Sequence, residues 1–188
     1  MSRRLEVGRA RVGAMRALGL AVVLACATAR AGPGPGDSPH RFTVYFTTGG
    51  AAYLSEARTF GGIGGGLGLR DTVGQYLLLQ ADVSYLMMVG NAGVLRVGAG
   101  LQRPGVYAPA ALFTLSCFWG ERLSFLTPQH PEPVAGPAVA AGLLLAPLRF
   151  VHDRTGVSLF QLNVGVGSDL PGAGLGLRVD VAEVGISF

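Results

Sequence analysis

Side chains able to perform nucleophilic or metal chemistry are few in this sequence and are poorly spaced for it. No Gly-x-Ser-x-Gly motif occurs, and none of His40, His130 and His152 lies two residues before a Ser. His130 and Glu132 offer two metal ligands, with Glu121 nearby, but a metal site needs a third or fourth ligand. All fifteen basic residues are Arg, which excludes a phosphate-loop lysine and a Schiff base. We therefore expect no catalytic residue, no cofactor and no metal.

The distribution of charge argues against nucleic-acid binding. Residues 1–31 hold six Arg and one Glu, a net charge of +5, whereas the rest of the chain holds nine Arg and ten acids, a net charge of −1. The basic character therefore belongs to the first residues, and the remainder has no cationic surface for a phosphate backbone. Only 14% of the 188 residues are charged, 30 are Gly, and the mean hydropathy is +0.44, which indicates that much of the surface faces something other than water.

The first residues have the three parts of a secretory signal peptide: an Arg-bearing start, the apolar run Ala17–Ala27, and small residues up to Ala31. We expect residues 1–31 to be removed after Ala31 or Ala29, whether translation starts at Met1 or at Met15. An alternative is a lipoprotein in which Cys26 is acylated. No disulfide is expected, since Cys26 and Cys117 are the only cysteines. Residues 32–39 predict a Gly/Pro linker, and residues 40–188 a single domain.

From His40 onward the dominant signal is period-two alternation, which places successive side chains on opposite faces of a strand. One face is bulky and apolar, while the other carries Gly, Ala, Ser and Thr with a few charged and amide side chains. The connections between segments are short, so neighbouring strands should be antiparallel. Eight segments alternate in this way: Arg41–Thr48, Gly61–Arg70, Gln75–Met88, Ala92–Arg103, Val106–Trp119, Val134–Pro147, Val157–Gly167 and Gly174–Phe188. The last segment changes register near Ala182, which predicts a β-bulge.

Eight strands of this length suit an all-β, eight-stranded antiparallel up-and-down transmembrane β-barrel. The bulky face would contact lipid, and the small polar face would fill a narrow interior. We expect Asp82 to pair with Arg96, and Arg178 with an acid on a neighbouring strand, because buried charges need partners. The predicted interior polar residues are Gln80, Asp82, Arg96, Gln161, Asn163, Arg178 and Asp180.

The connections fall into two sets, one at each end of the predicted barrel. Asp71-Thr72, Arg103–Gly105 and Leu148–Thr155 are expected at the periplasmic end. Gly49–Ala57, Val89–Asn91, Gly120–Glu132 and Ser168–Gly172 are expected at the extracellular end. Aromatic residues near segment ends predict belts at the two membrane interfaces: Phe60, Tyr85, Tyr107, Phe118, Trp119 and Phe188.

The signal peptide, the alternation over Arg41–Phe188 and the ending Val184–Phe188 together resemble the small outer-membrane β-barrel proteins of Gram-negative bacteria. The resemblance implies location in the outer membrane, with membrane lipid and the barrel-assembly machinery as partners and Phe188 as the assembly signal. It does not indicate an extracellular partner. The chain departs from the family in lacking Lys and in the prolines of Val134–Pro147.

These observations favour a non-enzymatic protein that anchors and displays surface loops, without a wide pore, because eight strands leave an interior just filled by side chains. Three alternatives remain. A lipid-modifying barrel enzyme would use His130, Glu132 and Glu121. A helical membrane protein would use the uncharged run Val134–Leu148, which is shorter than the roughly 20 residues a spanning helix needs. A periplasmic lipocalin-like barrel would be soluble, which fits poorly with the apolar outer face.

Overall fold

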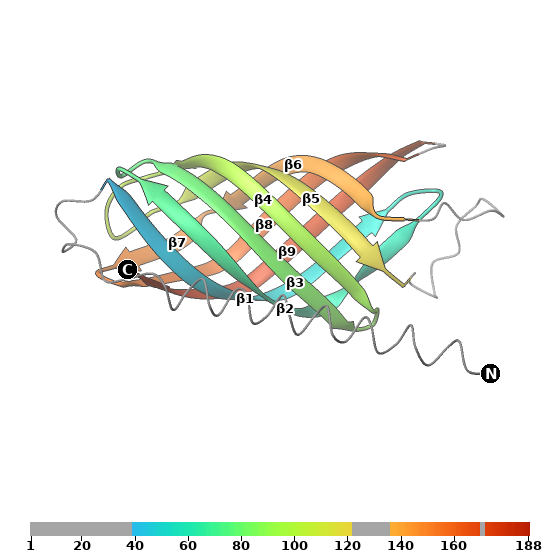
Figure 1. Cartoon of the computed structure of the whole chain (residues 1–188), viewed down its shortest axis with the longest axis horizontal. Coiled ribbons are helices and arrows are strands. Elements are labelled where there is room, and N and C mark those ends of the chain that lie inside the picture. Colours follow the sequence, from blue (N-terminus) through green and yellow to red (C-terminus); the bar gives the residue numbers. More distant parts are fainter. Residues whose placement is uncertain (1–38, 122–135, 170–171) are drawn as a thin grey trace. The chain divides into compact units, whose positions relative to one another are not determined.

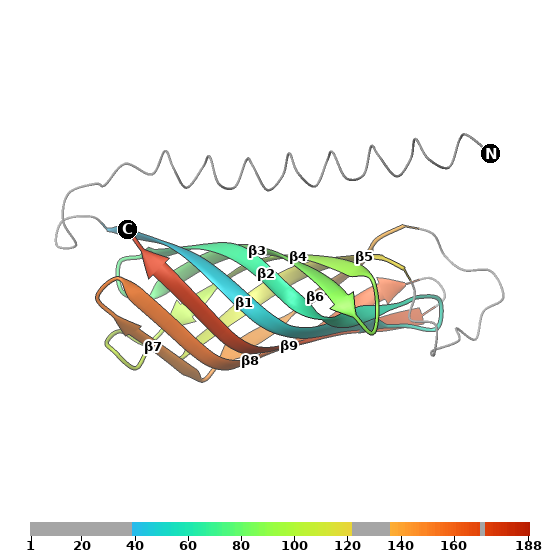
Figure 2. The ribbon, with the colours of Figure 1, turned by 90° about the horizontal axis from the view of Figure 1, so that it is seen from below.

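The computed structural model describes residues 39–121, 136–169 and 172–188. The predicted signal peptide and nearly all of the predicted linker lie outside these residues. The domain is a single antiparallel sheet that closes on itself, because the first strand pairs with the second on one side and with the last on the other (Figures 1 and 2). The strands are β1 (His40–Leu54), β2 (Thr59–Val73), β3 (Leu77–Met88), β4 (Ala92–Gln102), β5 (Ala110–Gly120), β6 (Ala138–Ala146), β7 (Leu148–His152), β8 (Thr155–Asp169) and β9 (Gly172–Ser187).

β6 and β7 occupy one position in the wall, so the barrel has the eight strand positions predicted from the sequence. Both pair with β8, β6 with its second half and β7 with its first half. Pro147 separates them because it has no N–H to donate. The other edge of β7 is covered by residues 106–108, where the N–H of Ala108 donates to the carbonyl of Arg149 at 2.8 Å. Pro137 and Pro147 thus flank β6 and do not interrupt it.

The predicted change of register in the last strand is confirmed. Thr48 of β1 lies opposite Ala182, but the next residue, Gly49, lies opposite Asp180, so Val181 is an extra residue in β9. The bulge lets Asp180 and Glu183 both point inward although they are three residues apart.

Four predicted connections are wrong in their bounds, because strands continue into them. Gly49–Leu54 belongs to β1, Asp71-Thr72 belongs to β2, and Leu148–His152 forms β7. In the connection Ser168–Gly172, β8 continues to Asp169 and β9 begins at Gly172. In each case Gly, Asp, Thr or Pro resembles a turn signal, yet the ladder of backbone hydrogen bonds continues. The connections at one end are residues 74–76, 103–109 and 153–154, and they define the turn end of the barrel; the second is longer than the predicted Arg103–Gly105, because β5 begins only at Ala110. Residues 55–58 and 89–91 lie at the other end, called the loop end (Figure 1).

The alternative of a helical membrane protein depended on the uncharged run Val134–Leu148, and this alternative is wrong because the run contributes strands. Residues 138–146 of that run form β6, with side chains alternately buried and exposed, and residue 148 begins β7. Within the described residues, no helix is both long and apolar enough to cross a membrane.

The interior of the barrel contains an apolar cluster on either side of a polar middle. One cluster lies toward the loop end and consists of Ala51, Tyr53, Phe60, Leu86, Ala92, Val94, Phe118, Ala138 and Ala140. The other lies toward the turn end and consists of Leu78, Ala110, Leu112, Leu144 and Ala146. Phe60 and Phe118 were predicted to lie in an outer aromatic belt, and this is wrong, since both rings point inward. Tyr53 and Phe118 pack with ring centroids 5.5 Å apart.

Gly68 shows how closely the interior is packed. It lies opposite Tyr45 on the neighbouring strand, and a Cβ at this position would overlap the Tyr45 ring. That ring lies under the guanidinium of Arg70, 4.4 Å from its centroid, and its hydroxyl donates to Asp82 at 3.2 Å. Gly68 therefore leaves the space in which Tyr45 joins the polar interior.

We expect Gly68→Val to reduce the folded fraction, because Tyr45 must move and lose both contacts, at a cost of roughly 1–3 kcal/mol. The measurement is the fraction of unboiled protein that migrates as the compact form on a denaturing gel. Gly156→Ala is the matched control, since an added methyl there meets no atom within 4 Å. Equal folded fractions for the two variants would contradict this account of the interior.

Candidate functional site

The outward face of the barrel is an apolar belt that runs around the wall. The alternation along each strand exposes its large apolar side chains and buries the polar ones between them. Phe113 of β5, for example, is 78% exposed. The belt includes Phe42, Phe46, Leu67, Leu69, Leu79, Leu95, Val97, Phe113, Leu115, Leu143, Val164 and Val184. Three of the predicted belt aromatics, Tyr85, Tyr107 and Trp119, are exposed on it.

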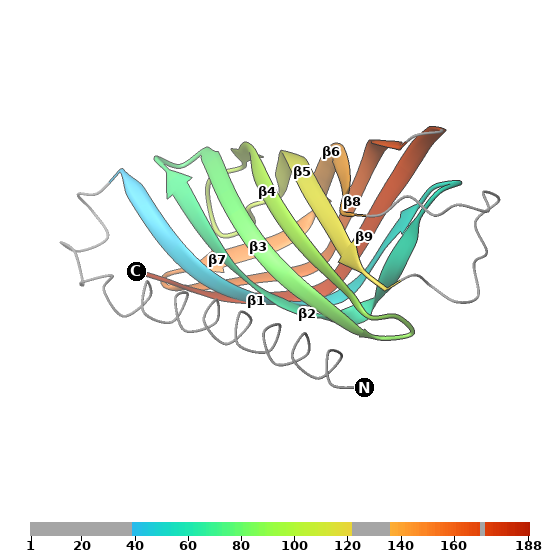
Figure 3. The ribbon, with the colours of Figure 1, turned by 45° about the vertical axis from the view of Figure 1, so that its right-hand side comes forward.

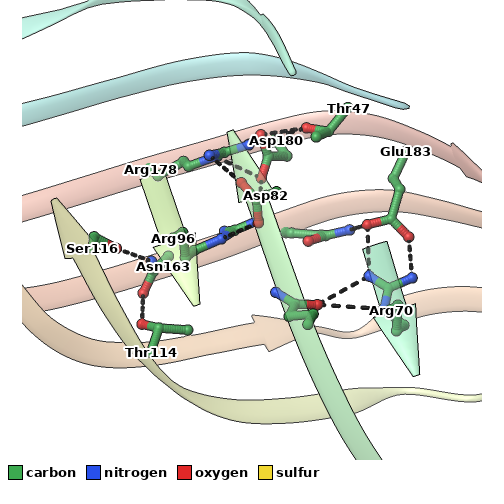
Figure 4. A network of polar contacts seen from close by, with 12 residues as sticks. Thr47, Arg70, Asp82, Arg96, Thr114, Ser116, Asn163, Arg178, Asp180 and Glu183 are labelled. Carbon is green, nitrogen blue, oxygen red and sulfur yellow. Dashed lines mark hydrogen bonds and ion pairs between the residues drawn. The ribbon is translucent and has the colours of Figure 1, made fainter. Parts of the chain in front are cut away.

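The inward face carries the polar residues singled out from the sequence. The structure buries all seven inside the barrel: Gln80, Asp82, Arg96, Gln161, Asn163, Arg178 and Asp180. They come from β3, β4, β8 and β9, so the closure of the sheet brings together residues up to 100 positions apart in the chain (Figures 3 and 4).

Two acids and two arginines form a neutral network at the centre of the interior (Figure 4). Arg96 donates through Nε to Asp82 at 2.8 Å, which is the pair expected from the sequence. Its Nη2 lies 3.5 Å from Asp180. Arg178 donates through Nη1 to Asp82 at 2.8 Å and through Nε to Asp180 at 2.9 Å. Thr47 donates to Asp180 at 2.7 Å and anchors the network to β1.

The partner of Arg178 differs from the expectation of an acid on an adjacent strand. β9 pairs with β1 and β8, yet Arg178 contacts Asp82 of β3, across the interior, and Asp180 of its own strand. In a barrel this narrow, a long side chain reaches the opposite wall, so pairing along the sheet is only one of its options. The network therefore connects opposite walls.

A second ion pair, which the sequence analysis did not predict, lies nearer the turn end. Arg70 of β2 donates to both carboxylate oxygens of Glu183 of β9, at 2.6 and 2.8 Å (Figure 4). Gln161 donates to the same carboxylate at 2.8 Å, and Gln80 accepts from Arg70 at 3.1 Å. Arg70 and Glu183 are not among the predicted interior residues; the alternation of their segments is consistent with the inner face, but it gives no sign that they meet across β1.

Amide and hydroxyl groups of β5 and β8, the two strands on either side of β6, complete the polar middle. Thr114 donates to Asn163 at 2.9 Å, and the amide of Asn163 lies 3.5 Å from the Ser116 hydroxyl (Figure 4). The cavity beside them has a volume of only about 10 Å³. The middle of the barrel is thus filled by side chains.

A third ion pair ties the loop end together. Arg58, in the connection between β1 and β2, pairs with Asp169 at the end of β8 and donates to the carbonyls of Gly136 and Pro137 at 3.1 and 2.7 Å. Ser55 also donates to Asp169, at 2.7 Å. Burial raises the pKa of Asp169, but the hydrogen bonds from Arg58 and Ser55 outweigh it and hold that pKa below the usual 3.8.

Of the three groups considered for catalysis, the structure describes only Glu121, which is exposed after β5. His130 and Glu132 lie outside the described residues. No three His, Cys, Asp or Glu side chains gather into a possible metal site within the described ranges. Phe188, the predicted assembly signal, is 62% exposed.

Comparisons with known proteins leave the family open. No family model matches the chain, and no curated protein matches it. Among solved structures, the chain is similar to Ail, the attachment invasion locus protein of Yersinia pestis, crystallised with the heparin analogue sucrose octasulfate. The two share 12% identity at a TM-score of 0.41, and the match covers 79% of this chain and 99% of Ail. At these values the similarity supports no conclusion about function.

We expect Asp82→Asn to destabilise the barrel by about 3–5 kcal/mol, since it leaves the guanidinium groups of Arg96 and Arg178 buried with less opposing charge. The measurement is the free energy of unfolding in urea from lipid vesicles. Ser84→Ala is the matched control two residues along β3, because the buried hydroxyl of Ser84 has no hydrogen-bond partner. A small, equal effect of both substitutions would show that the network does not stabilise the fold.

We expect the destabilisation caused by Asp169→Asn to depend on pH. A carboxylate whose folded pKa is depressed contributes stability above its unfolded pKa and loses that contribution as pH falls through the folded pKa. The wild type should therefore be more stable than Asp169→Asn at neutral pH, and the difference should shrink below about pH 4. Urea unfolding at both pH values measures it, and a difference that does not change with pH would contradict the assigned ion pair.

Proposed function

We propose that this chain is an outer-membrane β-barrel protein of a Gram-negative bacterium, which anchors and displays its loop-end connections and catalyses no reaction. The observation that carries the proposal is the polarity of the wall: large apolar side chains face outward and charged ones face inward. In lipid, every backbone polar group needs a partner, and a closed barrel supplies one for each strand. The sheet of this protein is closed, because β6 also pairs with β8, so neighbouring strands provide the hydrogen-bond partners.

The same polarity weighs against a soluble periplasmic barrel. A lipocalin-like protein would bury its bulky apolar face around a ligand and expose charges to water. Here the exposed apolar surface continues around the wall, far beyond the scattered patches of a soluble monomer. The orientation follows from the longest connection: 17 residues separate β5 from β6 at the loop end, and long loops belong outside the cell.

A barrel without a wide pore is supported by the filled interior. The polar network crosses the middle from wall to wall, and apolar clusters lie on either side of it. Arg96, the largest of the fully buried side chains, is 1% exposed. The protein would have outer-membrane lipid as a partner and would enter the membrane through the barrel-assembly machinery, which would read Phe188.

The proposal predicts that the cost of a charge on the outer face depends on depth. Leu115 lies outward in the middle of β5, and Met88 lies outward at the end of β3; both are at least half exposed. In vesicles, Leu115→Arg should cost about 2–4 kcal/mol of unfolding free energy and Met88→Arg about 0–1 kcal/mol. Leu115→Met is the control for lost packing.

Equal, small costs at both positions would show that water contacts the middle of the wall, and the outer-membrane proposal would then be wrong. A helical circular dichroism spectrum of the protein in vesicles would contradict the barrel itself.

A further inference from the structure

One buried cation has no acid to balance it. Among the buried charged residues that the structure describes, five are Arg and four are acidic. Arg58 pairs with Asp169, Arg70 with Glu183, and Arg96 and Arg178 with Asp82 and Asp180. The fifth cation, Arg149, is 4% exposed. Its Nε and Nη1 are buried and have no hydrogen-bond partner among the described residues.

Arg149 lies on the wall of a cavity at the turn end of the barrel. The cavity has a volume of about 140 Å³ and is also lined by Arg41, Arg70, Thr43, Ser187 and Glu183. A cavity of about 150 Å³ can hold a molecule as large as benzene, so the space suffices for a small ion. The hydroxyls of Thr43 and Ser187 lie 2.9 Å apart on the same wall.

The charges around this cavity add to a positive field. Those that act on Arg149 are the cations Arg70 and Arg41 and the anion Glu183. Glu183 already accepts two hydrogen bonds from Arg70 and one from Gln161. Arg41 has a buried, unpartnered Nη2, and the acid that acts on it, Asp153, is exposed on the turn between β7 and β8. Arg149 is thus an uncompensated cation at this cavity, and the unpartnered Nη2 of Arg41 lies on the same lining.

We propose that the turn-end cavity binds a small phosphate-type oxyanion, held by the guanidinium groups of Arg149 and Arg41, with the hydroxyls of Thr43 and Ser187 beside them. A guanidinium presents N–H groups in a fork that matches two oxygens of a phosphate. Burying a cation without a partner is costly, so an anion in the cavity would remove a penalty as well as add hydrogen bonds. The inference depends on the fold alone and is independent of the proposed location in the membrane.

Inorganic phosphate is the first probe, added to the folded protein in maltoside micelles at constant ionic strength maintained with chloride. We expect one phosphate to bind per chain by calorimetry, and the urea midpoint of the wild type to rise with phosphate concentration. Arg149→Gln should weaken binding roughly tenfold to a hundredfold. Without phosphate this variant should be at least as stable as the wild type, because the uncompensated charge is gone.

Arg154→Gln is the matched control, since it removes the same charge from the same end of the barrel at an exposed position that does not line the cavity. It should change phosphate affinity less than about twofold. If Arg149→Gln does not fold, Arg41→Gln decides, with weaker binding supporting the site and unchanged binding overturning it. No response of the wild type to phosphate, or the same response in Arg149→Gln, would show that water alone satisfies Arg149.

The oxyanion could come from solution or from a lipid headgroup, and a soluble lipid separates these sources. Dihexanoyl phosphatidylglycerol is titrated into the same micelles in place of inorganic phosphate. If it binds and competes with inorganic phosphate, the cavity is open to headgroups; if only inorganic phosphate binds, the ligand is a free anion. Either result requires the site. If neither inorganic phosphate nor the lipid binds, the proposal is wrong.

Discussion

The structure depends on one constraint: a charge buried inside a closed, narrow barrel needs an opposite charge and hydrogen-bond partners there. The outward face is apolar, so the polar side chains of every strand share the interior. Asp82, Asp180, Arg96 and Arg178 meet this constraint as a four-membered network across the lumen, and Arg70 and Glu183 meet it as a bidentate pair. Arg178 of β9 with Asp82 of β3, and Arg70 of β2 with Glu183 of β9, join strands that are not neighbours in the sheet, so these contacts also hold parts of the wall together across the interior.

The small residues of the inner face follow from the same constraint. Long side chains such as Arg96 and Tyr45 reach across the interior only if the positions facing them leave room. Gly68 leaves room for Tyr45, and on the outer face Gly93 leaves room for Trp119. The high glycine content, which as a bare composition signals turns or disorder, here reflects close packing between neighbouring strands.

Alternation predicted much of this fold, because a residue's face in a strand depends only on its position in the chain. It gave the eight strand positions, the inward residues and the bulge before Ala182. It could not give contacts across the lumen, since these depend on how the sheet closes, and so it missed the pair Arg70 and Glu183. It also misplaced Phe60 and Phe118, because an aromatic at a strand end suits an outer belt and an inner apolar cluster equally well.

The chain contains a single tryptophan, and its position offers the most direct test of which face contacts lipid. Trp119 lies at the end of β5 on the outer face and is 40% exposed. In vesicles, we predict blue-shifted emission that is quenched by brominated lipids, more by bromines near the headgroup than by bromines deep in the acyl chains. Emission that is quenched by aqueous iodide and is indifferent to brominated lipid would contradict the account.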